Sequence, residues 1–126
     1  MKKRIKLFVV VAALLLAAGT VAVAQRFLSN ADAALFRAAE YGTAKDVRAA
    51  IERGANVNAR NGYDGTTVLM AAAQYSRKPD VLWVLILAGA DVNARDNYGR
   101  TALWYAFAYN PNHDMREVLI DAGGER

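Results

Sequence analysis

Apolar positions in the second half of the chain follow a helical spacing. Between residues 79 and 89, apolar side chains recur three and four positions apart (Val81, Val84, Leu85 and Ala88). This spacing predicts an α-helix with one buried face. The segment just before it, Val68–Tyr75, is rich in alanine and predicts another helix that packs closely against its neighbours. The pattern is therefore that of paired helices.

Proline and glycine mark where these helices end. Pro79 and Pro111 each interrupt the chain ahead of a second helix, because proline cannot continue the helix before it. Gly54, Gly89 and Gly123 follow the second helices and suit the left-handed backbone at a helix end. In the first unit the expected second helix is Asp46–Arg53. Each unit is predicted to run helix, turn, helix and extended loop.

The same unit occurs three times. An interval of 34 residues separates the members of three triplets: Leu35, Leu69 and Leu103; Tyr41, Tyr75 and Tyr109; Asp46, Asp80 and Asp114. Residues 54–60 read GANVNAR and residues 89–95 read GADVNAR. We expect units at approximately 32–60, 61–95 and 96–126, the first opening on a helix cap at 29–32. Such units bury their apolar faces by stacking.

The N-terminal segment differs from the rest. Four basic residues lie within the first six positions, and Leu7–Ala24 carries no charge and ends in Ala22-Val23-Ala24. A basic end, an apolar middle and small residues at the cleavage site are typical of a signal peptide. We expect residues 1–24 to be a signal peptide and 25–31 a short linker before the repeat domain, 32–126.

An uncleaved signal anchor is the alternative for residues 1–24, because 18 apolar residues reach the lower limit for spanning a bilayer. Both readings place the repeats outside the cytoplasm. The domain is then periplasmic or secreted after cleavage, or else anchored at the inner membrane. The chain has no cysteine, which excludes disulfides.

Charge argues against a nucleic-acid partner. The net charge is +4, but four of the 16 basic residues belong to the leader, and the remaining 12 equal the 12 acidic residues. Binding to nucleic acid requires a surplus of positive charge. From residue 25 onward there is none.

Two motifs identify a known family. Residues 65–73 read GTTVLMAAA and residues 99–106 read GRTALWYA, and both resemble the G-x-T-P-L-H-x-A signature of ankyrin repeats. GADVNA at 89–94 is similar to the hairpin-forming end of that repeat. The resemblance covers residues 32–126. It implies an all-α ankyrin-repeat solenoid of about three helix-turn-helix units with short hairpin loops, preceded here by an N-terminal apolar helix.

The chain departs from this signature in three ways. The signature proline is Ala34, Val68 and Ala102, and the signature histidine, which ties neighbouring loops in the family, is Phe36, Met70 and Trp104. Units two and three carry one extra residue between the aspartate of the turn and the closing glycine. The last unit stops without a hairpin, as a terminal cap would.

The resemblance also implies where a protein partner binds. In the family, contacts come from hairpin tips and the exposed side of the first helix. The corresponding tip residues are Tyr63, Asp64, Thr66, Asn97, Tyr98 and Arg100. The helix positions are Glu40, Tyr41, Gln74, Tyr75, Ala108 and Tyr109, with Tyr105 at a neighbouring position. Tyrosine suits such a surface because it offers a large contact area at little entropic cost. The alternative is that the tyrosine row packs unit against unit.

A second surface is indicated on the back of the repeats. Trp83 and Leu87 are four residues apart and share one helical face. The flanking units carry charged residues at these positions (Arg48, Glu52, Glu117 and Asp121). The pair is either an exposed contact patch or the result of a locally rotated helix.

Catalytic and cofactor chemistry is not indicated. The single histidine, His113, stands in a turn, and there is no cysteine or second histidine for a zinc site. We expect no enzyme activity, no metal and no cofactor. The sequence favours an exported bacterial protein-interaction module, either an envelope adaptor or a toxin-immunity protein. The alternative is a membrane-anchored structural element that self-associates through Trp83 and Leu87.

Overall fold

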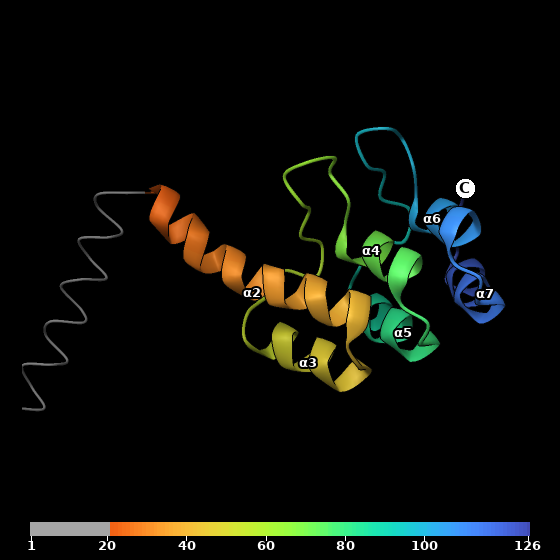
Figure 1. Cartoon of the computed structure of the whole chain (residues 1–126), viewed down its shortest axis with the longest axis horizontal. Helices are drawn as coiled ribbons and strands as arrows, with labels where there is room; N and C mark the ends of the chain where they lie inside the picture. The colour runs from red at the N-terminus through yellow and green to blue at the C-terminus, as the bar shows by residue number, and fades with distance from the viewer. Residues whose placement is uncertain (1–20) are drawn as a thin grey trace, which may run out of the picture. The chain divides into compact units, whose positions relative to one another are not determined.

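The computed structural model describes the backbone of residues 21–126 and the side chains from Asn30 onward (Figure 1). The chain divides into two compact units, Met1–Asn30 and Ala31–Arg126. Most of the expected signal segment, and with it the cleavage alternative, lies outside the described residues. Within residues 21–126, no helix combines the length and apolarity needed to cross a membrane.

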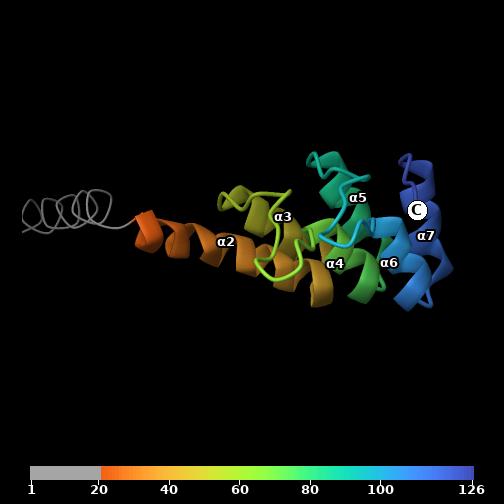
Figure 2. The same cartoon turned by 90° about the horizontal axis from the view of Figure 1, so that it is seen from above.

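Residues 21–126 form six α-helices and no strand. These are α2 (Val21–Tyr41), α3 (Ala44–Glu52), α4 (Val68–Tyr75), α5 (Pro79–Leu87), α6 (Ala102–Tyr109) and α7 (His113–Asp121). The all-helical expectation is confirmed for this part of the chain, and α4 has the predicted bounds. In Figure 2, α3, α5 and α7 form one layer, and α4 and α6 lie in the other.

The first helix does not begin where the sequence predicted. α2 is continuous through residues 29–32, so this segment is not a helix start, and the expected linker at 25–31 is helical. Asp32 does not cap the helix. Its carboxylate accepts a hydrogen bond of 2.8 Å from the Asn56 amide. It thereby connects the first helix of the unit to the loop after α3.

Threonine begins three of the helices. The hydroxyls of Thr43, Thr67 and Thr101 accept hydrogen bonds from amides three residues later, at 3.3, 3.2 and 3.2 Å. N-cap bonds of this kind satisfy amides that have no partner inside the helix. Asp46 completes a capping box with Thr43. For this reason α3 begins at Ala44, two residues before the predicted start at Asp46.

The extra residue of units two and three lies in the turn, not in the second helix. Two residues, 42–43, connect α2 to α3, whereas three residues, 76–78 and 110–112, make the later turns. The three second helices all have nine residues. Asp46 therefore has a later helical position than Asp80 and Asp114, despite the constant interval of 34.

The core follows the repeat. Leu35, Leu69 and Leu103 are at most 5% exposed, and each belongs to the first helix of a unit. Alanine lets these helices approach closely: Ala72 and Ala73 of α4 are fully buried. α4 and α6 pack together, as do α3, α5 and α7 in sequence. The apolar spacing of the sequence therefore becomes one continuous core.

Asparagine side chains tie each loop to the next. Asn58 donates to the Gly89 carbonyl at 3.1 Å and accepts from the Asp91 amide at 2.8 Å. Asn93 repeats this arrangement one unit later, with the Gly123 carbonyl and the Glu125 amide. The asparagine of the repeated N-A-R motif thus binds successive loops together.

The turns are tied in the same way. Asn110 is buried, and its amide nitrogen donates to the carbonyls of Ala73 at 2.8 Å and Ser76 at 2.7 Å. Asn112 donates to the Arg77 carbonyl at 3.0 Å. Carbonyls at the end of α4 that lack a partner inside the helix are thereby satisfied by the next unit.

Candidate functional site

A cleft of about 300 Å³ opens between the first helices and the hairpin loops. We call it the concave cleft. Its lining comes from α2, α4 and α6 and from the two hairpins, and comprises Phe36, Glu40, Asn61, Asp64, Thr66, Ala71, Gln74, Tyr75, Arg100, Tyr105 and Tyr109. Many of these are residues that the sequence placed at the partner surface. The structure brings the helix positions and the hairpin positions together in one depression.

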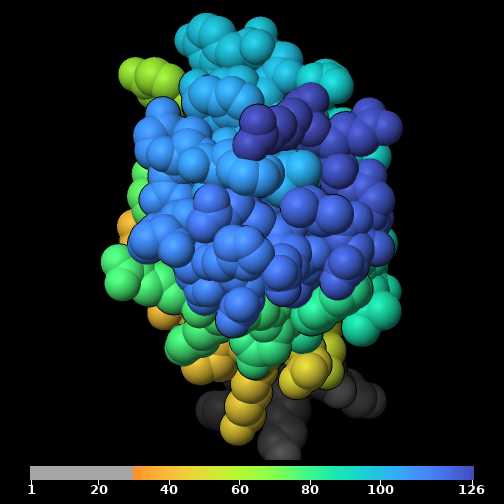
Figure 3. Space-filling view, turned by 90° about the vertical axis from the view of Figure 1, so that its right-hand side faces the viewer, coloured from red at the N-terminus to blue at the C-terminus, as the bar shows by residue number. Residues whose placement is uncertain are grey.

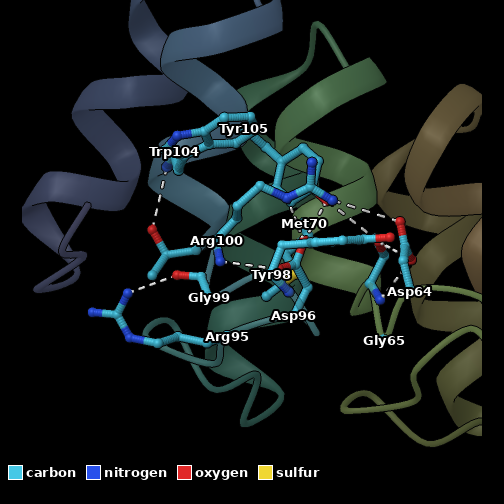
Figure 4. Close-up of polar contacts among 12 residues, drawn as sticks. Asp64, Gly65, Met70, Arg95, Asp96, Tyr98, Gly99, Arg100, Trp104 and Tyr105 are labelled. Atoms are coloured by element: carbon cyan, nitrogen blue, oxygen red, sulfur yellow. Dashed lines mark hydrogen bonds and ion pairs between the residues drawn. The ribbon is translucent and has the colours of Figure 1, made fainter.

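Asp96 organises the second hairpin at the edge of the cleft (Figure 4). Its Oδ1 accepts from the amides of Tyr98 and Arg100, both at 2.9 Å. Its Oδ2 accepts from Arg100 Nε at 2.7 Å and from the Tyr105 hydroxyl at 2.6 Å. Asp96 is only 6% exposed, so these four bonds replace water around the carboxylate. One side chain thus fixes both the loop backbone and the two side chains that border the cleft.

The protonation states of this cluster are firmly set. Burial acts to raise the pKa of Asp96, but the hydrogen bonds from Tyr105, Arg100 and Tyr98 outweigh it and lower the pKa to about 2. Burial, followed by the hydrogen bond to Asp96, raises the pKa of Tyr105 to about 12. At neutral pH the aspartate is ionised and the tyrosine is neutral. The cluster therefore positions the hairpin and does not exchange protons in the physiological range.

The first hairpin is connected to the second through Asp64. Its Oδ1 accepts from the Thr66 hydroxyl at 2.6 Å, and its backbone carbonyl accepts from the Asn97 amide at 2.8 Å. Hydrogen bonding by Thr66 is the leading cause that lowers the pKa of Asp64. The Asp64 Oδ2 also lies 3.7 Å from Arg100 Nη2. The two tips are therefore held in a fixed relation.

Arg60 contributes a further tie between the hairpins. Its guanidinium Nη1 donates to the carbonyls of Gly65, at 3.0 Å, and Arg95, at 2.7 Å. Met70, at one of the signature histidine positions, is fully buried and accepts a long contact of 3.4 Å from the Thr67 amide. The loops are thus connected without the histidine, through arginine, asparagine and aspartate.

The tyrosine row is partly packed and partly open. Tyr41, Tyr75 and Tyr109 are 71%, 49% and 54% exposed. The rings of Tyr41 and Tyr75 nevertheless lie 6.2 Å apart, and Tyr109 stands 5.8 Å from Trp104 in an edge-on arrangement. The contact of Tyr41 with Tyr75 joins two units, as the packing interpretation predicts, whereas partner binding by the row stays a prediction. Its outer ring faces remain free to contact another molecule.

The remaining candidates fall into two groups. Tyr63 and Tyr98 stand at the tips, 98% and 73% exposed, and Asn97 is exposed beside Tyr98. Gln74 is half-buried in the cleft. The expectation for Tyr105 needs correction, because Tyr105 is only 3% exposed. Its hydroxyl is occupied by Asp96, so it supports the cleft wall and is not on the open surface.

Trp83 and Leu87 lie on the outer face of α5. Leu87 is 83% exposed and Trp83 38% exposed. α5 has the same length as α3 and α7, so the extra turn residue gives no reason to infer a rotated helix. Leu87 borders a groove of about 320 Å³ between α3 and α5, which we call the back-face groove. Its lining is Arg48, Ile51, Glu52, Val84, Leu87 and Ala88.

His113 has two acidic neighbours at the start of α7. Its Nδ1 lies 3.3 Å from Glu117 Oε1, and Asp114 is close enough for one metal ion to reach all three side chains. All three are exposed. Water satisfies exposed groups of this kind. Glu117 follows Asp114 by three residues and His113 by four on the same helix, and this spacing alone explains why the three side chains are close.

Stacked helix pairs connected by interlocked hairpins define an α-helical repeat protein. The sequence matches the family described as ankyrin repeats (3 copies), over residues 10–96 and 35–125. The chain belongs to the ankyrin-repeat family. A comparison with curated proteins finds no match. Ankyrin repeats are generally protein-interaction modules without enzyme activity.

Proposed function

We propose that this chain is an exported protein-binding module that contacts its partner through the hairpin tips and the concave cleft. The observation that carries this proposal is the pairing of two half-exposed tyrosines, Tyr75 and Tyr109, with hairpins that Asp96 and Asp64 hold rigid. A surface that is ordered before binding loses less entropy when a partner arrives.

The side chains of the hairpin tips support the same function. Tyr63 and Tyr98 extend from the two tips as exposed aromatic side chains, 98% and 73% accessible. The guanidinium of Arg100 lies 4.7 Å from the Tyr98 ring centroid and limits its freedom. Tyrosine and arginine are enriched among residues that contribute most to protein interfaces. The tips and the cleft together offer one aromatic surface.

Two roles fit such a module behind an export signal. An adaptor for an envelope enzyme would bind its partners with moderate affinity. A toxin-immunity protein would bind one partner very tightly. We infer a location outside the cytoplasm, periplasmic or secreted after cleavage, or anchored at the inner membrane. The leader composition supports export, and the affinity of the recovered partner separates the two roles.

The test is cross-linked affinity capture with the tagged full chain from envelope extract. Three baits are compared: the wild type, the double variant Tyr75→Ala/Tyr109→Ala, and Leu87→Ala as a matched control on the opposite side. We expect one protein to be recovered by the wild type and by Leu87→Ala and to be lost with the double variant. Equal recovery by all three baits would contradict binding through the concave cleft.

The back-face groove supports a second candidate function, a membrane-anchored structural element that self-associates. Leu87 is almost fully exposed, and Arg48 and Glu52 provide opposite charges on the same groove. Two copies related by a two-fold axis would bury both leucines and pair these charges. Sedimentation of the full chain in non-ionic detergent tests this. A concentration-dependent dimer that Trp83→Glu abolishes supports it, and a monomer at all concentrations rejects it.

A further inference from the structure

The concave cleft carries an excess of negative charge. Glu40 and Asp64 line it, and Arg100 is the only basic residue in its lining. Arg100 is already engaged by two carboxylates, through Nε to Asp96 at 2.7 Å and through Nη2 to Asp64 at 3.7 Å. Its charge is therefore balanced within the protein. One negatively charged carboxylate in the cleft therefore has no counter-ion.

Glu40 is that carboxylate. It is half-buried on α2, and within the described residues no hydrogen bond or ion pair reaches its side chain. Desolvation by burial raises the pKa of Glu40. Loss of water with no replacement partner is unfavourable for a charged group, so a positive charge brought into the cleft would be stabilised there. Two exposed arginines lie outside the lining of the cleft: Arg37, three residues before Glu40 on α2, and Arg77, which lines the adjoining depression beyond Tyr75. The charges of both are screened by solvent.

The walls suit a cation as well. Tyr75, Tyr109 and the ring of Phe36 line the same cleft as Glu40. The face of an aromatic ring carries negative potential and attracts lysine and arginine side chains. A volume of about 300 Å³ is at the lower end of ligand pockets. It has room for one long side chain and not for an extended ligand.

We propose that the concave cleft receives a lysine or arginine side chain of the partner protein, with Glu40 as counter-ion and Tyr75 and Tyr109 as walls. This rests on the proposed binding function and adds the chemistry of the partner's anchoring residue. The partner then presents a basic residue on a projecting segment, because the cleft lies between the hairpins and the first helices.

The experiment uses small probes, so it does not depend on identifying the partner. The isotopically labelled full chain in non-ionic detergent is titrated with N-acetyl-arginine amide, N-acetyl-lysine amide and the neutral N-acetyl-glutamine amide. Amide shifts are followed by NMR. We expect saturable shifts at Gln74, Tyr75 and Tyr109 with the two basic probes, and weaker ones with the neutral probe. Added salt should reduce this difference.

Two variants decide the role of Glu40. Glu40→Gln keeps the shape and removes the charge, and we expect it to weaken binding of the basic probes by about threefold to fivefold, which corresponds to a partly exposed ion pair. Asp121→Asn, which changes an exposed carboxylate on α7, should leave binding unchanged. Equal shifts with neutral and basic probes, or an unaltered affinity in Glu40→Gln, would overturn the inference.

The outcomes also separate this inference from the binding function itself. If capture of a partner depends on Tyr75 and Tyr109 but the basic probes show no preference, the interaction module stands and the basic anchor is rejected. If the basic probes bind with dependence on Glu40 but no protein is captured, the chemistry of the cleft is upheld and the proposed function fails.

Discussion

Replacing Asp96 by asparagine tests the central cluster most directly. The carboxylate accepts four hydrogen bonds, two from the amides of Tyr98 and Arg100 and two from side chains, Arg100 Nε and the Tyr105 hydroxyl. An asparagine has one acceptor oxygen and one NH₂ group. The NH₂ group of the asparagine would replace one carboxylate oxygen and would face hydrogen-bond donors, with which it cannot pair. The substitution also leaves the guanidinium without its closest counter-ion.

The magnitude follows from the pKa. Lowering the pKa of Asp96 from 3.8 to about 2 corresponds to about 2 kcal/mol of folding free energy. Because the folded pKa is depressed, this contribution is fully present above the unfolded pKa and is lost as the pH falls toward the folded pKa. About half of it is gone at about pH 3.

Urea unfolding of the full chain in non-ionic detergent, followed by circular dichroism from neutral pH down to about pH 3, measures this directly. We expect Asp96→Asn to be less stable than the wild type by about 2 kcal/mol at neutral pH, and the gap to narrow by about 1 kcal/mol at about pH 3. Glu52→Gln, on the exposed end of α3, should show no such convergence. A gap that stays constant across this pH range would refute the assignment of Asp96 as the dominant ionised group of the hairpin.

Three further predictions test other parts of the structure. Asn110→Ala removes two hydrogen bonds to buried carbonyls and should cost about 1–3 kcal/mol in urea unfolding. Gly65→Ala places a side chain at a φ of +75° and should cost about 1–2 kcal/mol, whereas Gly62→Ala, with open space around it, should be close to neutral. Tyr75→Ala/Tyr109→Ala should abolish partner capture and shift Tm by less than about 4 °C, and a larger drop would favour a packing role for the row.

The fold could be predicted from the sequence because equivalent positions in the three units can be compared with one another. Leu69 and Leu103 are buried as Leu35 is, and Val68–Tyr75 forms the predicted helix. Equal spacing did not guarantee equal structure, however. Asp46 and Asp80 are 34 residues apart but occupy different helical positions, since an added turn residue shifts the register.

The hydrogen-bonded cluster was not predicted, and the physical reason is its dependence on three-dimensional contacts. Asp96 immediately follows the repeated N-A-R motif, where the preceding unit has Asn61, and nothing in its local sequence distinguishes it from a solvated loop residue. Its partners are a tyrosine on α6 and an arginine of the same hairpin. The available signal was a spacing of four residues between Asp96 and Arg100, next to a helix with aromatic residues in its first turn.

The exposure of Tyr105 also depends on three-dimensional contacts that its sequence position does not reveal. The repeat placed it near Tyr109, and exposure was inferred from that neighbourhood. The two rings do lie 6.2 Å apart, but Tyr105 is covered and Tyr109 is half-exposed. Helical positions four apart share a face only approximately, and the hairpin that closes over α6 covers one ring and not the other. A sequence pattern assigns a face, whereas the position of a loop over it decides exposure.

The polar and aromatic residues around the cleft have two different roles: some connect the hairpins, and others remain exposed. Asp96, Asp64 and Arg100 are used to connect the hairpins to each other and to α6, so little of their hydrogen-bonding capacity is free for a partner. Tyr75 and Tyr109 make few bonds of this kind and keep half of their surface open. Loss of a connecting residue should therefore lower stability and binding together, while loss of a tyrosine should lower binding alone. Because a three-unit stack has little stability in reserve, this division lets the binding surface change without endangering the fold.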